Sequence, residues 1–297
     1  MTSGLKLGQT DISIGKIAYG CWRFAQRDVA TADRLIRTAL DAGMNLIDTA
    51  DIYGFSEFPD REDKGFGQAE VRLGEVLAAA PSLRKQMVLT TKGGIDAVRP
   101  YDSSYRYIMA AMDASLARLQ TDYVDLYQIH RPDLSTPLRE TARALNEIFQ
   151  SGKARHIGVS NFTVAQTRAL QSHLDTPIVT LQPEFSAIQQ DAITDGTLDY
   201  GMETGATVLA WSPLGGGRLP TKDGAVQAAL DEIALRYGIS RSVAALAFTR
   251  AHGADVVPII GTQTPQRITE SGYAAQINLT GREFYDIVEA YRGQSMP

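Results

Sequence analysis

Residues 45–54 read NLIDTADIYG, and the rest of the chain is organised around this stretch. Residues 45–47 suit a short buried strand, which stops at Asp48, and Tyr53 follows five residues later on the loop beyond. Burying even a neutral polar group costs roughly 2–7 kcal/mol unless a partner compensates it, and a carboxylate costs more. The stretch therefore predicts a buried cation beside Asp48, which another part of the chain must supply.

The composition suits an ordinary soluble globular protein and excludes several classes of function. The chain has 297 residues, 44% hydrophobic and 21% charged, with a net charge of −5 and no basic block, so we expect no nucleic-acid partner. No apolar run reaches the ~18–20 residues of a membrane span. The single cysteine, Cys21, fits a reducing compartment, and the scattered histidines argue against a metal site. We therefore expect a cytoplasmic protein without a metal.

Strand-like and helix-like segments alternate along the chain, which predicts a parallel α/β sheet. Eight such units predict a closed (β/α)8 TIM barrel that forms a single domain over residues 1–297. An open doubly wound sheet is disfavoured because no GxGxxG motif follows the first strand. The expected strands lie at 17–20, 45–48, 87–92, 124–128, 156–160, 179–182, 208–211 and 256–260, and the expected helices at 31–42, 68–80, 103–119, 137–151, 163–173, 193–204, 241–251 and 265–274.

Further features lie outside this eight-fold pattern. An N-terminal β-hairpin is expected to turn at residues 8–11, and two extra amphipathic helices are expected at about 225–237 and 280–292. Several of the expected helices also begin with residues that favour a helix N-terminus. These are the N-cap residues Thr163 and Ser240 and the first-turn prolines Pro137 and Pro265.

The barrel prediction indicates where a site would lie, because active sites of such barrels form at the carboxyl ends of the strands. Asp48 and Tyr53 follow the second expected strand, Lys92 ends the third and His130 follows the fourth. We expect these side chains to meet at one mouth of the barrel. Lys92 is then the cation that Asp48 requires.

The residue types in this group predict proton donation to an oxygen. A tyrosine ordinarily titrates near ~10, and a nearby ammonium such as that of Lys92 should lower the pKa of Tyr53. The group can then protonate an oxygen that becomes an alkoxide as its carbon is attacked, with His130 orienting the carbonyl. No Ser or Cys nucleophile lies beside a base, so we expect the attacking species to be a hydride from a cofactor.

The chain resembles the aldo-keto reductase family over nearly its whole length, with the motifs in the family's order. Any one of these motifs is weak evidence, whereas eight in register are specific. The motifs are DTADIYG (48–54), GQAEVRLG (67–74), TTKGG (90–94), DLYQIHRPD (125–133), GVSNF (158–162), LQPEFS (181–186), AWSPLGGGR (210–218) and PIIGTQTPQRITES (258–271).

The resemblance implies that the chain reduces carbonyl compounds with NADP(H). Tyr53 would be the general acid, Lys92 would perturb its pKa, and Asp48 would hold Lys92. His130 would orient the substrate, with Trp22 at the substrate pocket. The residues implied to bind the cofactor are Gly20 at its edge; Ser160, Asn161 and Gln182 at the nicotinamide carboxamide; Trp211 on the nicotinamide ring; Ser212, Leu214, Gly215 and Arg218 at the pyrophosphate; and Gly261, Thr262, Thr264, Arg267, Glu270 and Ser271 at the adenosine end.

Three positions depart from the family pattern. Trp211 stands where many members carry tyrosine or phenylalanine, and Ser271 stands where asparagine is often found. Gly261 stands where some members carry a lysine beside the 2′-phosphate. Arg267 remains to bind that phosphate bidentately, and NAD(H) stays open as an alternative cofactor.

Each site residue also has a structural explanation when it is considered alone. Asp48 and Lys92 could be a buried ion pair, Trp211 could be a core aromatic, and residues 215–217 could be a flexible turn. Their joint placement at the ends of the expected strands favours a functional site over these explanations.

Three functions remain open from the sequence. The first is an NADP(H)-dependent reductase that acts, as a monomer, on a small-molecule aldehyde or ketone. The second is a non-catalytic or weakly catalytic relative that binds nucleotide as a redox sensor, and the third is an unrelated barrel enzyme with a phosphate-bearing substrate. The intact set of Asp48, Tyr53, Lys92 and His130 argues against a purely regulatory protein.

Overall fold

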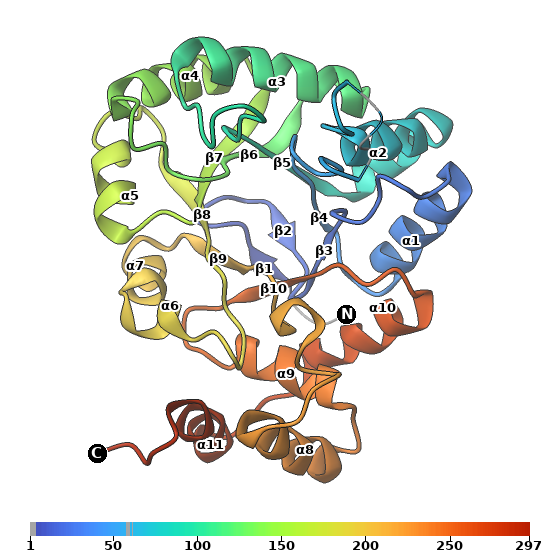
Figure 1. Cartoon of the computed structure of the whole chain (residues 1–297), viewed down its shortest axis with the longest axis vertical. Helices are drawn as coiled ribbons and strands as arrows, with labels where there is room; N and C mark the ends of the chain where they lie inside the picture. Colours follow the sequence, from blue (N-terminus) through green and yellow to red (C-terminus); the bar gives the residue numbers. More distant parts are fainter. Residues whose placement is uncertain (1–3, 58–59, 61) are drawn as a thin grey trace.

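The computed structural model describes residues 4–57, 60 and 62–297, and its centre is a closed barrel of eight parallel strands (Figure 1). Neighbouring strands follow the chain order, and the last strand closes the barrel against the first. The prediction of a TIM barrel is confirmed. The strands are β3 (Ala18–Gly20), β4 (Leu46–Asp48), β5 (Val88–Gly93), β6 (Val124–Ile129), β7 (Ala154–Ser160), β8 (Ile178–Gln182), β9 (Thr207–Ala210) and β10 (Val257–Ile260).

Helices surround the barrel, and the two extra helices, α8 and α11, lie against each other outside the ring (Figure 1). Within the described residues, no helix combines the length and apolar character needed to cross a membrane. The helices are α1 (Val29–Asp41), α2 (Gln68–Ala79), α3 (Tyr105–Leu119), α4 (Leu138–Gln150), α5 (Val164–Gln171), α6 (Asp191–Thr194), α7 (Thr197–Thr204), α8 (Ala225–Tyr237), α9 (Arg241–Arg250), α10 (Pro265–Gly272) and α11 (Gly281–Arg292), with short 3-10 turns η1 (Pro81–Gln86), η2 (Gly215–Gly217) and η3 (Tyr273–Gln276).

The helix expected at 193–204 is broken into α6 and α7. Gly196 has a φ of 86°, a left-handed conformation that interrupts the helix. The Asp195 carboxylate accepts a hydrogen bond from the backbone N–H of Thr197 at 2.8 Å, which starts α7. The sequence pattern missed this break because both halves present apolar residues to the same core.

The helix starts agree with the sequence at three of the four expected positions. The side chains of Thr163 and Ser240 cap α5 and α9, and Pro265 is the first residue of α10. The sequence predicts Pro137 in the first turn of α4, and this prediction is wrong. It is the residue before the helix, because its ψ of 129° is extended rather than helical.

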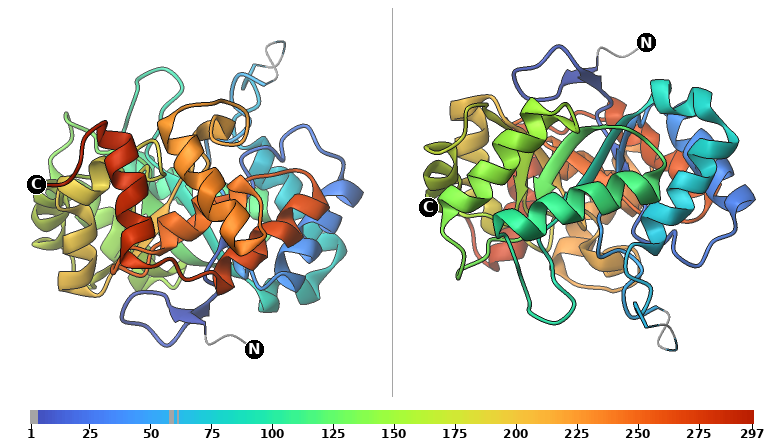
Figure 2. Two further views of the ribbon diagram at one scale, coloured as in Figure 1. Left: turned by 90° about the horizontal axis from the view of Figure 1, so that it is seen from below. Right: turned by 90° about the horizontal axis from the view of Figure 1, so that it is seen from above.

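The predicted N-terminal hairpin is present and closes one end of the barrel. Strands β1 (Leu5–Lys6) and β2 (Ser13–Ile14) pair antiparallel. The buried side chains of Leu7 and Ile14 pack in one cluster with apolar residues of the barrel strands. Figure 2 shows the hairpin at one end of the barrel and the loop after β4 projecting from the other end. The hairpin thereby leaves the carboxyl ends of the strands as the open mouth.

Strand β5 is held from outside the barrel by a series of buried side-chain hydrogen bonds to α2 and α3. The Thr91 hydroxyl donates to Glu70 of α2 at 2.5 Å, and Arg118 of α3 donates to the other oxygen of Glu70 at 2.7 Å. Because side chains alternate along a strand, Lys92 points the opposite way, into the barrel. The hydrogen bonds outside the barrel thus hold the strand segment that carries Lys92.

Gly74 lies where α2 approaches α3, and a Cβ built there would stand 2.0 Å from the carbonyl oxygen of Arg118. Gly74→Ala should lower the free energy of unfolding by about 1–3 kcal/mol through overpacking, although alanine is the better helix former. Gly281→Ala is the matched control, because a Cβ there meets nothing within 4 Å. Urea denaturation measures both variants. A Gly74→Ala variant more stable than the wild type would contradict the close approach.

Candidate active site

Lys92 is the centre of the site and is fully buried at the end of β5. Its Nζ donates to Asp48 Oδ2 at 2.7 Å, to the carbonyl oxygen of Thr49 at 2.9 Å and to the hydroxyl of Tyr53 at 3.1 Å. An ammonium group has three protons, so all of them are used. The buried cation that the sequence predicts beside Asp48 is therefore Lys92.

Both carboxylate oxygens of Asp48 have partners. Oδ2 accepts from Lys92, and Oδ1 accepts from Nε2 of Gln182 at 3.1 Å. Gln182 ends β8, which lies opposite β4 in the strand order, so the amide reaches across the barrel. Burial acts to lower the pKa of Lys92, but the charge of Asp48 and the contact with Tyr53 outweigh it and raise that pKa overall. The ammonium stays charged, and the buried pair is satisfied on both sides.

Burial and charge act in opposite directions on Tyr53. Burial raises the pKa of Tyr53 above its ordinary value, and the ammonium of Lys92 lowers it by less. The expectation of a net lowering is wrong, because it neglected the cost of desolvating a phenolate. Lys92 still makes this phenolate easier to form than it would be in an equally buried site without a cation. At neutral pH the phenol carries its proton, which is the form that a proton donor requires.

His130 lies beside Tyr53 as a neutral imidazole. The two rings meet edge to face with their centroids 5.9 Å apart. Burial, together with the positive charges of Lys92 and Arg131, lowers the pKa of His130 well below its usual value. Its Nδ1 is buried and has no hydrogen-bond partner among the described residues. A neutral ring at this place can donate or accept one hydrogen bond without adding charge to the site.

A web of hydrogen bonds connects the residues expected at the nicotinamide. The Ser160 hydroxyl donates to the carbonyl oxygen of Gln182 at 2.9 Å, and Nδ2 of Asn161 donates to Ser160 Oγ at 2.9 Å. The indole N–H of Trp211 donates to Asn161 Oδ1 at 2.9 Å. Asn161 has a φ of 60°, an uncommon conformation for a residue with a side chain. The web therefore joins Asp48, through Gln182, to the indole of Trp211.

The loop after β9 turns tightly at residues that have left-handed backbones. Ser212 has a φ of 50°, and the three glycines at 215–217 have φ values of 60°, 65° and 91°. A Cβ on Gly215 would come within 2.4 Å of Ile188, so the loop needs glycine there for space as well as for conformation. Arg218 folds back, and its Nε donates to the carbonyl oxygen of Gly215 at 2.9 Å.

The loop after β10 is tied to the first barrel strand and to the loop that follows that strand. The hydroxyl of Tyr19 donates to the carbonyl oxygen of Thr262 at 3.0 Å, and Arg23 donates to that of Gly261 at 3.0 Å. The loop leads into α10, where Arg267 is exposed. The other residues expected at the adenosine end are Thr264, just before this helix, and Glu270 and Ser271 within it, with the Ser271 hydroxyl bonded to its own helix backbone.

The two loops fit a dinucleotide with negatively charged phosphates. Arg218 and Arg267 form no ion pair with any described residue, so their charges are not already neutralised within that part of the chain. Oε1 of Gln263 is buried in the second loop and has no partner among the described residues. Cationic side chains are the feature expected beside phosphates, whereas the amide oxygen of Gln263 can only accept, and so suits an O–H or N–H group of the nucleotide.

A scan against protein families matches residues 16–292 to the model described as the aldo/keto reductase family. The chain belongs to this family. It is 47% identical over 98% of its length, and 96% of the relative's, to a 6-dehydroglucose reductase of Novosphingobium aromaticivorans. It is 35% identical to a 6-dehydroglucose reductase of Agrobacterium fabrum, over 93% of this chain and 94% of that one. As a member of this family, the chain is an oxidoreductase.

Solved structures of the family share the fold. A thermostable aldo-keto reductase in complex with the inhibitor epalrestat superposes with a TM-score of 0.83 and 28% identity, over 96% of this chain and 98% of that one. An aldo/keto reductase of Klebsiella pneumoniae in complex with NADP and acetate superposes with a TM-score of 0.79 and 25% identity, over 98% of this chain and 96% of that one.

Sequence reasoning missed three features of this family member's site. The carbonyl oxygen of Thr49 is the third partner of Lys92. The guanidinium of Arg131 lies 5.9 Å from the ring centroid of Trp211, and that of Arg23 lies 5.1 Å from the ring centroid of Trp22. A backbone oxygen leaves no signal in the sequence. Arg23 and Arg131 each directly follow a predicted site residue, and this adjacency is the signal that could have identified them.

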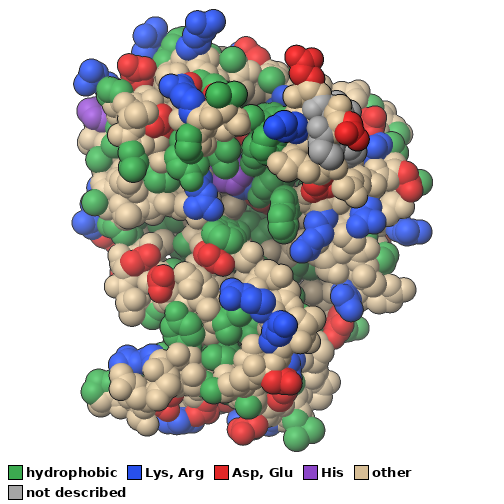
Figure 3. Space-filling view, viewed as in Figure 1, with side chains coloured by type: hydrophobic (Ala, Val, Ile, Leu, Met, Phe, Trp, Pro, Cys, Tyr) green, Lys and Arg blue, Asp and Glu red, His purple; other side chains and the backbone are tan. Residues whose placement is uncertain are grey.

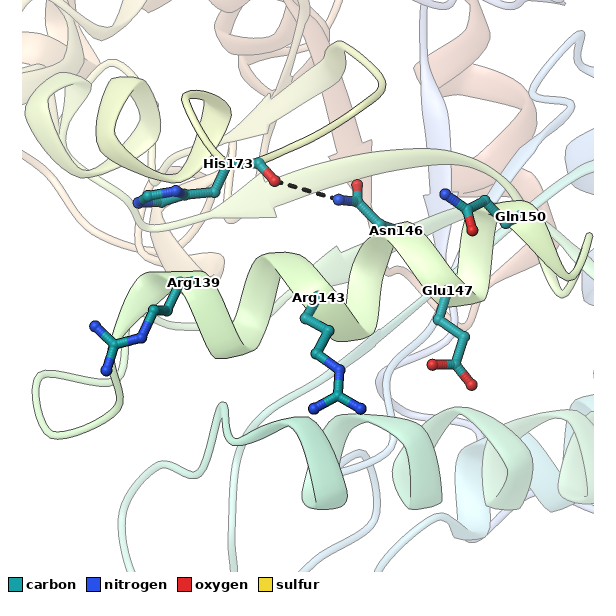
Figure 4. Close-up of a pocket in the computed structure, with 6 residues that line it drawn as sticks. All are labelled: Arg139, Arg143, Asn146, Glu147, Gln150 and His173. Atoms are coloured by element: carbon teal, nitrogen blue, oxygen red, sulfur yellow. Dashed lines mark hydrogen bonds between the residues drawn. The ribbon is translucent and has the colours of Figure 1, made fainter.

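The mouth is a depression that contains hydrophobic side chains and has Lys and Arg side chains around it (Figure 3). Trp22 is 54% exposed there. A second hollow lies elsewhere, on the outward face of α4, where Asn146 donates to the carbonyl oxygen of His173 at 3.2 Å (Figure 4). Across the described residues, no group of three His, Cys, Asp or Glu side chains is placed to hold a metal ion.

Lys92→Met should lower the free energy of unfolding by about 3–5 kcal/mol, because it leaves the carboxylate of Asp48 buried without its cation. The double variant Lys92→Met with Asp48→Asn should recover much of this loss, since neither charge is then unpaired. Chemical denaturation of the two variants and the wild type measures the difference. Equal stabilities for the single and double variants would mean that Asp48 does not depend on Lys92.

Proposed function

We propose that this chain reduces an aldehyde or ketone to an alcohol with NADPH as the hydride donor and Tyr53 as the general acid. The observation that carries the proposal is the contact of Lys92 with both Asp48 and Tyr53 at the mouth of the barrel. A buried phenol next to a fixed ammonium is suited to give up a proton to an oxygen that gains negative charge.

The chain's own residues have distinct tasks in this proposal. Tyr53 donates its proton to the substrate oxygen, and the ammonium of Lys92 stabilises the phenolate that remains. Asp48 keeps Lys92 in place and balances its charge. His130 donates a hydrogen bond to the same carbonyl oxygen and orients it. The ring does so in its neutral form, because burial and the nearby charge of Lys92 lower the pKa of His130.

The cofactor would be held by two groups of residues, and when bound it supplies the hydride that reduces the carbonyl carbon. Ser160, Asn161 and Gln182 would bind the nicotinamide amide, and Trp211 would stack on the ring. The loops after β9 and β10 would bind the phosphates. The residues assigned to those loops are Ser212, Leu214, Gly215, Arg218, Gly261, Thr262, Thr264, Arg267, Glu270 and Ser271, with Gly20 at the cofactor's edge.

We propose an aldehyde-bearing sugar of the 6-dehydroglucose type as the substrate. The support is the activity for which two relatives are named, one of them 47% identical over nearly the whole chain. The exposed indole of Trp22 at the mouth offers a flat apolar surface of the kind on which a sugar ring packs. We propose a monomer in the cytoplasm, with a small-molecule partner only.

The second candidate, a nucleotide-binding redox sensor without turnover, is disfavoured by the same contacts. A sensor needs a cofactor site but has no need of a buried phenol held against an ammonium. The third candidate, an unrelated barrel enzyme, is excluded by membership of the aldo/keto reductase family.

The substrate class is tested by following NADPH oxidation at equal concentrations of 6-dehydroglucose, benzaldehyde and glucose. We expect rapid oxidation with 6-dehydroglucose, slower oxidation with benzaldehyde, and none above background with glucose, which is the control that lacks the second aldehyde. Each assay is repeated with NADH, which should support less turnover. Binding of NADPH without oxidation in any of these assays would favour the redox sensor instead.

Tyr53→Phe should reduce kcat by about 10²-fold or more, because it removes only the hydroxyl that donates the proton. The affinity for NADPH should change little, since the phenol is not among the residues proposed to bind it. Steady-state kinetics and calorimetric titration measure the two effects on the same preparation. Normal aldehyde reduction by this variant would show that another group is the acid.

A further inference from the structure

Arg23 is an exposed cation that lies beside the loop after β10, and the mechanism above does not use its charge. It forms no ion pair with any residue that the structure describes. Its Nη1 donates to the carbonyl oxygen of Gly261 at 3.0 Å, and its guanidinium lies 5.1 Å from the ring centroid of Trp22. These two contacts hold a positive charge at a defined place at the mouth.

The space above Gly261 is occupied by this guanidinium. A Cβ built on Gly261 would stand 3.8 Å from Nη1 of Arg23 and 3.7 Å from the carbonyl oxygen of Gly20, which is ordinary van der Waals contact. The absence of a side chain at Gly261 therefore leaves room for Arg23 to lie over the loop. A longer cationic side chain at position 261 would place its charge in the same region.

A second guanidinium group, that of Arg267, lies just beyond the far end of the loop after β10. Arg267 is exposed in the first turn of α10 and also forms no ion pair with any described residue. The start of a helix favours anions, because its backbone N–H groups point outward and the helix dipole is positive there. Two guanidinium groups without an ion-pair partner among the described residues, one from the loop after β3 and one from α10, are together with the start of that helix suited to a phosphate.

We propose that Arg23 binds a phosphate group of the dinucleotide cofactor, an inference that rests on the proposed function. One N–H of its guanidinium is engaged by Gly261, which leaves other N–H groups of the same planar fork to donate to phosphate oxygens. Strand β10 lies between β9 and the first barrel strand, β3, so the loop after β3 thereby takes part in cofactor recognition from the side of β10 that faces away from β9. Its target is the adenosine phosphate or the pyrophosphate.

The test is a calorimetric titration of the full-length protein with NADPH and with NADH, which needs no turnover. Arg23→Gln keeps an N–H donor for the carbonyl oxygen of Gly261 but removes the charge, and it should weaken NADPH binding about tenfold or more. Arg23→Lys should retain most of the affinity. The double variant Arg23→Gln with Gly261→Lys should recover affinity, because it returns a cation to the same space.

The comparison of the two cofactors identifies the phosphate. A loss confined to NADPH assigns Arg23 to the adenosine 2′-phosphate, whereas an equal loss for NADH assigns it to the pyrophosphate, and both results support the inference. NADPH affinity within twofold of the wild type for Arg23→Gln would overturn it. A loss that neither lysine variant restores would also overturn it, because Arg23 would then act only on the conformation of the loop.

The outcome is distinguishable from a failure of the proposed function. If the wild type binds NADPH but reduces no carbonyl compound, the assignment of catalysis fails while the titrations still test Arg23. If the wild type binds neither cofactor, both proposals fail. Unfolding temperatures of all variants without cofactor are the control for a general loss of structure.

Discussion

One ammonium group, buried inside the barrel, organises the site. Lys92 uses its three protons on a carboxylate, a backbone carbonyl and a phenol, and the carboxylate is held in turn by an amide from the opposite strand. A charge at this depth is tolerated only because every donor and acceptor around it is paired. The contacts that offset the desolvation cost of the buried ammonium also fix the tyrosine hydroxyl at the mouth.

The surroundings of the ion pair have separate structural and electrostatic consequences. From outside the barrel, Thr91, Glu70 and Arg118 hold the strand that carries Lys92. Inside it, burial and, after it, the positive charges of Lys92 and Arg131 lower the pKa of His130 and keep it neutral, and burial keeps Tyr53 protonated. The web from Gln182 to Trp211 then extends this rigid centre towards the loops proposed to bind the cofactor. The residues proposed for catalysis and those proposed for binding the nicotinamide thus share one hydrogen-bonded framework.

The sequence predicts the barrel and the meeting of the polar side chains at its mouth, because the barrel follows from periodic patterns and the meeting from polar residues at strand ends. Asp48, Lys92 and Tyr53 meet as their strand positions require. The direction of the Tyr53 pKa could not be predicted, since it depends on how deeply the packed structure buries the phenol. The contact of Arg23 with Gly261 joins residues 238 positions apart, a distance over which a local pattern carries no information.

The most direct test of this account is the pH dependence of kcat for aldehyde reduction at saturating NADPH. The acid must hold its proton, and burial raises the pKa of Tyr53, so activity is present below that pKa and is lost as pH rises through it. His130 stays neutral because its pKa lies well below its usual value. We therefore expect a flat profile from about pH 7 to about pH 9, with a decline only at more alkaline pH, beyond the ordinary tyrosine value of ~10. A decline with its midpoint near neutral pH would contradict the buried, protonated phenol as the proton donor.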